Sequence, residues 1–65
     1  MTFIRVYAND SHKFYICKNG KFWYAIAEKK YKKPSLNTSM ISKHTSKIKA
    51  ISCAQRWAEW VDERF

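Results

Sequence analysis

Residues 13–27 read Lys13-Phe-Tyr-Ile-Cys-Lys-Asn-Gly-Lys-Phe-Trp-Tyr-Ala-Ile-Ala27. The stretch contains two runs of aromatic and β-branched residues, which favour the pleated surface of a β-sheet. Between the runs lies Asn19-Gly20, and both residues tolerate the positive φ that a two-residue hairpin turn requires. The sequence therefore predicts a β-hairpin with strands at residues 13–18 and 21–27.

Three further segments extend this hairpin along the chain. Residues 3–8 have the composition of another strand and are followed by the turn signal Asn9-Asp10. Residues 28–35 contain four lysines and the only proline, which predicts a loop. Residues 38–42 fit a short additional strand.

The pattern changes its period after Ser46. Apolar residues then recur three or four positions apart, the spacing of one helix face: Ile51, Ala54, Ala58, Val61 and Phe65. Thr45 or Ser46 can cap a helix over residues 47–64. We therefore expect a single α+β domain over residues 1–65, in which a small antiparallel three- to four-stranded sheet packs against one C-terminal helix in the order β-β-β-(β)-α.

A two-residue turn at Asn19-Gly20 assigns the side chains of the strands to two faces. One face is the more uniformly apolar and carries Tyr15, Cys17, Phe22, Tyr24 and Ile26, joined by Ile4 and Val6. The other face mixes aromatic and basic residues and carries Phe14, Ile16, Lys18, Lys21, Trp23 and Ala25, joined by Phe3, Arg5 and Tyr7. One helix covers only one face, and we expect it to cover the first.

The second face, left open, has two interpretations. It can be a nucleic-acid platform, in which cations hold phosphates and aromatic rings contact sugars, bases or methyl groups. Alternatively, the rings only close over a thin core, with lysine stems lying across them. A one-residue change of register, which a bulged turn would produce, exchanges the two faces completely.

Length and composition exclude several classes of protein. A chain of 65 residues is too short for a two-domain enzyme with a cleft between its lobes. Three Trp, four Tyr and four Phe argue against a disordered chain. No apolar run approaches the ~20 residues that span a bilayer, and no signal-peptide core follows Met1. We therefore expect a cytoplasmic protein, associated with the nucleoid if it binds DNA.

The net charge of +8 is concentrated in one part of the chain. Residues 11–49 carry ten lysines against one acid, Glu28, for a net +9, whereas residues 50–65 sum to −1. This segregation favours an anionic partner, although a lysine-rich solvated surface would also account for it. Ten Lys against three Arg favour point-charge contacts with phosphates over bidentate readout of guanine.

The sequence indicates neither a metal site nor a catalytic site. His12, Cys17, His44 and Cys53 lack the close pairing of structural zinc ligands, so we expect no metal. Two reduced cysteines in the core are expected rather than a disulfide. The acids are not grouped with a nucleophile or base, and a single glycine cannot form a phosphate-cradling loop. We expect a protein that is not an enzyme and uses no cofactor.

The hairpin resembles a DNA-binding family in the stretch Asn19-Gly20-Lys21-Phe22-Trp23-Tyr24-Ala25-Ile26. The family comprises the amino-terminal arm-binding domains of tyrosine recombinases, which are similar in shape to the plant AP2 domain. Such domains place a three-stranded sheet in the major groove, with one helix behind it. The family's alanine-rich helix is similar to the segment containing Ala50, Ala54, Gln55, Arg56 and Trp57.

The resemblance extends over about residues 13–60. This chain departs from the family in the extra strand at residues 3–8 and in lacking a Thr-x-x-Glu-Ala entry to the helix. The resemblance implies that Lys18, Lys21 and Trp23 make contacts from the sheet face.

We predict binding of duplex DNA through one sheet face and the lysine-rich loop at residues 29–33. Phosphate contacts are assigned to the basic residues Arg5, Lys18, Lys21, Lys29, Lys30, Lys32, Lys33 and Lys43. Tyr7 and Trp23 would contact the groove or its walls. RNA is a variant of the same prediction, because exposed aromatic rings can stack on splayed bases.

The alternative is a small inhibitor or adaptor that binds an acidic surface of a protein partner, as small proteins of phages and mobile elements do. Trp23 and Trp60 would then anchor the interface, because aromatic residues dominate interface energetics. A third prediction is self-association through the strand at residues 3–8, whose edge only Arg5 protects.

Overall fold

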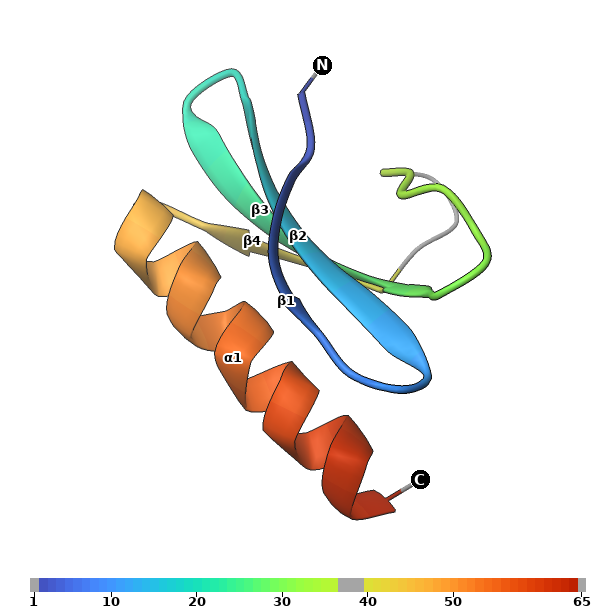
Figure 1. Ribbon diagram of the computed structural model, residues 1–65. Coiled ribbons are helices and arrows are strands. Elements are labelled where there is room, and N and C mark those ends of the chain that lie inside the picture. Colours follow the sequence, from blue (N-terminus) through green and yellow to red (C-terminus); the bar gives the residue numbers. More distant parts are fainter. Residues whose placement is uncertain (1, 37–39, 65) are drawn as a thin grey trace.

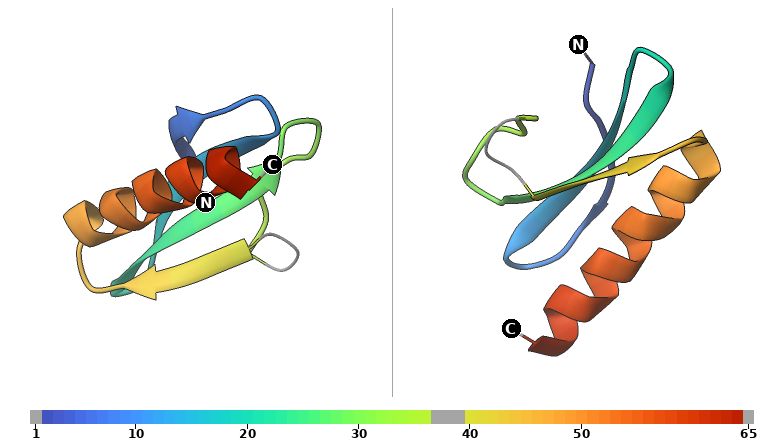
Figure 2. Two further views of the ribbon diagram at one scale, coloured as in Figure 1. Left: turned by 90° about the horizontal axis from the view of Figure 1, so that it is seen from below. Right: turned by 180° about the vertical axis from the view of Figure 1, so that it is seen from behind.

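The computed structural model describes residues 2–36 and 40–64. Its elements are β1 (Ile4–Ala8), β2 (His12–Asn19), β3 (Phe22–Lys29), β4 (Met40–His44) and α1 (Lys47–Arg64). The strands form one antiparallel sheet in sequence order, and α1 lies along one face of it (Figure 1, Figure 2). The predicted α+β class and the C-terminal helix are confirmed. Of the strand predicted at residues 38–42, residues 38 and 39 lie outside the described residues.

The β2–β3 turn lies one residue later than predicted. Asn19 pairs with Phe22, so the two turn residues are Gly20 and Lys21. Gly20 has a φ of 68°, and no other described residue has a positive φ. A type II′ turn needs a positive φ only at its first central residue, whereas a type I′ turn over Asn19-Gly20 needs two. Moving the turn by one residue changes the cross-strand partner of each residue by two positions, so that Cys17 pairs with Tyr24 and not with Phe22. Residues two positions apart in a strand point to the same face, so the hairpin side chains keep their predicted faces.

A β-bulge changes the side-chain pattern of β1. Arg5 pairs with Tyr15 and Tyr7 pairs with Phe14, which leaves Val6 as the extra residue between them. An extra residue interrupts the strict alternation of a strand. The prediction that Arg5 and Tyr7 share a face is therefore wrong, and both Tyr7 and Val6 pack against the core under α1.

Asn9 organises the β1–β2 turn and joins it to α1. Its Oδ1 accepts hydrogen bonds from the backbone N–H groups of Ser11, at 3.0 Å, and His12, at 2.8 Å. Its Nδ2 donates to the carbonyl oxygen of Ala58, 3.4 Å away. Side-chain hydrogen bonds of this kind stabilise a turn locally. The same residue therefore connects this end of the sheet to the second half of α1.

The helix α1 begins at a capped end and packs through small residues. The N–H of Lys49 donates to Oγ of Ser46 over 3.2 Å, so Ser46 is the N-cap. Ala50 and Ala54 are fully buried, and Ile51 packs against the same core. Within residues 2–36 and 40–64 no helix is long and apolar enough to cross a membrane.

The helix covers the opposite face of the sheet from the one predicted. The buried cluster beneath it consists of Phe14, Ile16, Ala25, Ala27, Ala50 and Ala54. The prediction weighed the two faces by their apolar content, but the shape of the side chains matters more. Alanines on both β3 and α1 let the helix approach the sheet closely, while Phe14 and Ile16 fill the remaining space. The ring-rich face of Tyr15 and Tyr24 would hold a helix farther away.

Candidate nucleic-acid interface

We call the sheet face opposite α1 the open face. The strand register places on it the side chains of Arg5, Ala8, Lys13, Tyr15, Cys17, Asn19, Phe22, Tyr24, Ile26, Glu28, Ile41 and Lys43. Three basic residues, one acid and three aromatic rings therefore share this face with smaller and aliphatic residues. The mixture of basic and aromatic residues that we expected to be exposed on the face of Phe14 and Trp23 is therefore exposed on the face of Tyr15 and Tyr24.

Two contacts arrange the rings of the open face. The rings of Phe3 and Tyr15 meet edge-on, with centroids 6.5 Å apart and an interplanar angle of 77°. The ammonium of Lys43 lies 4.4 Å from the centre of the Phe22 ring. A lysine stem that lies over a ring keeps its charged end available to solvent or to an anion. Lys43 is thus a cation held in place on an exposed surface.

The centre of the open face is dry. Cys17 and Ile26 are fully buried, although α1 lies on the other side of the sheet. Burial raises the pKa of the Cys17 thiol, because a thiolate would lose its hydration there. The segment after β3 leaves the sheet on this same side (Figure 1), and Pro34 and Leu36 within it are half-buried. The open face therefore combines an apolar centre with cations at its margins.

The predicted phosphate contacts fall into three groups. Arg5 and Lys43 lie on the open face, on the two edge strands β1 and β4. Four exposed lysines lie at the end of β3 and in the segment that follows it: Lys29, Lys30, Lys32 and Lys33. Lys18 and Lys21 are exposed at the β2–β3 turn, at the opposite end of the sheet. The length of β3, about 24 Å, separates the last two groups.

Tyr7 and Trp23 lie on the α1 side of the sheet. Both are partly buried and pack against the core. The ammonium of Lys47 lies 5.7 Å from the centre of the Trp23 ring. The structure therefore does not bring these two rings together with Arg5 and Lys43.

Two exposed lysines outside the predicted set, Lys47 and Lys49, join Lys18 and Lys21 at one end of the molecule. They lie at the start of α1, where the helix dipole adds partial positive charge. The β4 strand ends beside the start of β3, which brings the helix start close to the β2–β3 turn. Sequence reasoning missed this grouping because it depends on the pairing of β4 with β3, which no local pattern indicates.

The acidic residues whose side chains are described lie toward the end of the molecule opposite to the β2–β3 turn. Asp10 is in the β1–β2 turn, and Glu59 is in the second half of α1. Glu28, near the end of β3, is 8% exposed, and its Oε1 accepts a hydrogen bond from the N–H of Lys29 over 2.8 Å. These acids share their end of the molecule with Lys29, Lys30, Lys32 and Lys33, whereas Lys18, Lys21, Lys47 and Lys49 lie at the opposite end, away from the acids whose side chains are described.

Neither a metal cluster nor a disulfide is present in the part of the chain that the structure describes. No group of three His, Cys, Asp or Glu side chains there could hold a metal ion. Cys17 and Cys53 remain thiols and lie on opposite sides of the sheet, because Cys17 is on the open face and Cys53 is on α1.

Comparison of the chain with models of known families, with curated proteins and with solved structures found no match. The resemblance to the arm-binding domains of recombinases stays a prediction from the hairpin residues.

Proposed function

We propose that this protein binds duplex DNA with the open face of its sheet and the lysines of residues 29–33. The supporting observation is that Arg5 and Lys43 flank the open face while the lysine-rich segment leaves the sheet on the same side (Figure 1). Cations on the two edges and beyond one end of a surface can hold phosphates on both sides of a groove. The α1 helix then lies behind the sheet, away from the DNA.

The dimensions of the molecule suit a site of this kind. Its longest axis is 33 Å, close to the length of one turn of B-DNA, about 34 Å. The lysines at residues 29–33 can therefore hold one part of the phosphate backbone while Lys21, in the β2–β3 turn, reaches the backbone farther along. Lys18, which pairs with Trp23, lies on the α1 side of the sheet. Electrostatic contacts with phosphates fix orientation and supply most of the affinity.

The rings of the open face take the role that was predicted for Tyr7 and Trp23. Tyr15, Phe22 and Tyr24 are each only partly buried and lie between the flanking cations. They can contact sugars or the methyl groups of thymine. Arg5 is the one arginine that the register of the described strands places on this face, and it is therefore the candidate for a bidentate contact with guanine. We expect high affinity at low salt and weak sequence preference.

Titration of a labelled 20-bp duplex at several salt concentrations tests the proposal. Six to eight phosphate contacts predict that log K falls with log salt at a slope of about −5 to −7. Absence of binding at ~50 mM salt would contradict the proposal. A duplex RNA of the same length should bind more weakly, because the major groove of A-form RNA is too narrow for a sheet.

Two double variants with the same change of charge separate a specific surface from a general excess of charge. Lys32→Glu with Lys33→Glu should weaken binding at least ~10-fold and make the salt slope about 2 less negative. Lys49→Glu with Arg56→Glu changes exposed residues on α1 and should weaken binding much less. Equal losses in both variants would show that net charge alone attracts the DNA.

A further inference from the structure

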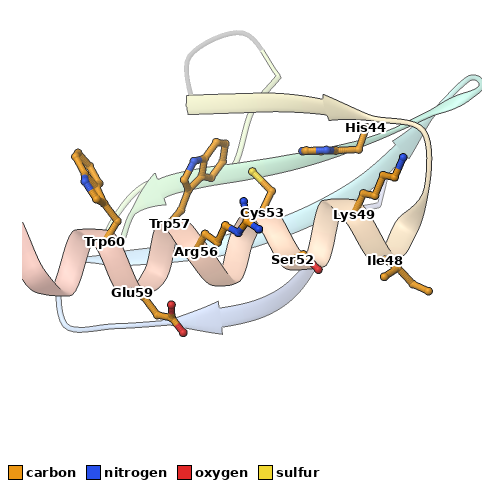
Figure 3. A pocket seen from close by; sticks show the side chains of 9 residues that line it. All are labelled: His44, Ile48, Lys49, Ser52, Cys53, Arg56, Trp57, Glu59 and Trp60. Atoms are coloured by element: carbon orange, nitrogen blue, oxygen red, sulfur yellow. The ribbon is translucent and has the colours of Figure 1, made fainter.

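A groove lies between α1 and β4 on the helix side of the sheet. It has a volume of about 900 Å³ and is lined from α1 by Cys53, Arg56, Trp57 and Trp60 and from β4 by His44. In Figure 3, Cys53, Trp57 and Trp60 project from α1 toward β4, and the ring of His44 extends into the same space. This groove lies on the opposite side of the sheet from the open face.

The groove exposes large apolar side chains beside cations. Ile48 is 76% exposed and Trp60 is 45% exposed, which are high values for residues of their size. Lys49, Arg56 and Glu59 line the same groove and are exposed, so two cations and one carboxylate border it. Apolar residues bordered by polar ones are typical of an interaction surface.

His44 adds an unsatisfied polar atom to this groove. Its Nε2 is shielded from solvent and has no hydrogen-bond partner in the described part of the chain. Shielded polar atoms in proteins are nearly always hydrogen-bonded. Because protein atoms cover Nε2, a bound molecule would supply the missing bond only after the side chains that cover it move aside.

The shape of the groove suits an extended peptide. It runs along α1 from Ile48 to Trp60, which is about 18 Å at the rise of a helix. The neighbouring strand β4 has five residues, or about 17 Å, and pairs on one side only, with β3. An edge strand beside a groove can accept one more strand, whose main chain pairs with the edge while its side chains enter the groove.

We infer that this groove binds an extended acidic peptide segment of a partner protein, which adds to β4 as a fifth strand. Apolar side chains of the peptide pack against Trp57 and Trp60, and its carboxylates lie beside Lys49 and Arg56. Charge complementarity selects this occupant over a second copy of the chain. A second copy carries a net charge of +8 and would bring a second Lys43 to the same edge.

Selection from a displayed library of random nine-residue peptides tests the inference. The immobilised probe is the whole protein, and competing duplex DNA is omitted. We expect the selected peptides to alternate apolar and acidic residues and to bind with micromolar affinity. A selection that yields no binders, or binders without acidic residues, would overturn the inference.

Variants of exposed residues then locate the bound peptide. Trp60→Ala should weaken binding of a selected peptide at least tenfold, and so should Lys49→Glu with Arg56→Glu. Lys32→Glu with Lys33→Glu has the same charge change as the second variant and should bind the peptide within about twofold of the native protein. Unchanged binding in the Trp60 variant, with its circular dichroism spectrum intact, would place the peptide elsewhere and refute the inference.

The proposed peptide site and the proposed DNA site can each be refuted without refuting the other. Trp60→Ala should bind the 20-bp duplex as the native protein does, because Trp60 lies on the other side of the sheet from Arg5 and Lys43. Loss of DNA binding therefore tests the open face, and loss of peptide binding tests the groove.

Discussion

At the scale of single residues, the two cysteines differ in environment. Cys17 is fully buried on the open face, and burial raises the pKa of its thiol. Cys53 is partly exposed and lines the groove between α1 and β4. The thiolate attacks a thiol reagent as a nucleophile, so the reagent must be able to reach the sulfur. The two thiols should therefore report on different parts of the molecule.

We predict that a chromogenic disulfide reagent modifies one thiol in the native protein and two in denaturant. Mass spectrometry of proteolytic fragments should assign the native label to Cys53, and Cys53→Ser should abolish it. Rapid native labelling of Cys17 would contradict the burial described above.

Because native Cys17 keeps its proton to a higher pH than the same thiol in the unfolded chain, its contribution to the free energy of unfolding decreases as the pH rises above the usual thiol pKa of 9.0.

At the scale of elements, Asn9 links the β1–β2 turn to α1. Its side chain accepts two backbone hydrogen bonds in the turn and donates one to the carbonyl of Ala58. Replacement by Ala removes all three and leaves polar groups of the turn without partners. We predict that Asn9→Ala lowers the free energy of unfolding in urea by about 1–3 kcal/mol.

Asn19→Ala is the matched control for this prediction. Asn19 is exposed, is the last residue of β2 and has a negative φ, so its replacement should change the free energy of unfolding by less than about 0.5 kcal/mol. A larger loss for Asn19→Ala than for Asn9→Ala would mean that the turn is centred on Asn19-Gly20 after all.

The elements themselves were largely predictable because their signals are local. The composition of residues 13–27, the glycine at the turn and the apolar spacing after Ser46 all act within a few residues of each other. The choice of the covered face was not predictable in this way. It depends on the fit of alanines on β3 against Ala50 and Ala54, which are far apart in the sequence.

The candidate site was predictable in part, for a related reason. The basic residues Arg5, Lys43 and Lys29–Lys33 were named from charge alone, and the structure places them on or beside one face. Tyr7 and Trp23 lie on the face of Phe14, as predicted, but α1 covers that face, and the bulge at Val6 places Arg5 on the opposite one. The bulge and the position of α1 are tertiary features. The groove beside β4 left no sequence signal beyond the prediction that Trp60 could anchor a partner.

At the scale of the whole molecule, we propose that the two sides of the sheet bind two kinds of partner. In this proposal the open face and the lysine segment bind DNA, and the groove between α1 and β4 binds an acidic peptide. The molecule is 33 Å long and 15 Å across its shortest axis. A peptide that adds to β4 would lie beside Lys43, so the two partners would meet at that edge of the sheet. Binding of DNA should depend more strongly on salt than binding of the peptide, because the DNA makes the larger number of ionic contacts.

A titration of the ¹⁵N-labelled protein with a 20-bp duplex, followed by amide chemical shifts, tests the central claim most directly. If the open face binds the duplex, the largest shifts should fall on Arg5, on Lys43 and on residues 29–33, while amides of residues 52–60 of α1 should change little. Shifts that are largest along residues 52–60, with the open face unaffected, would contradict it.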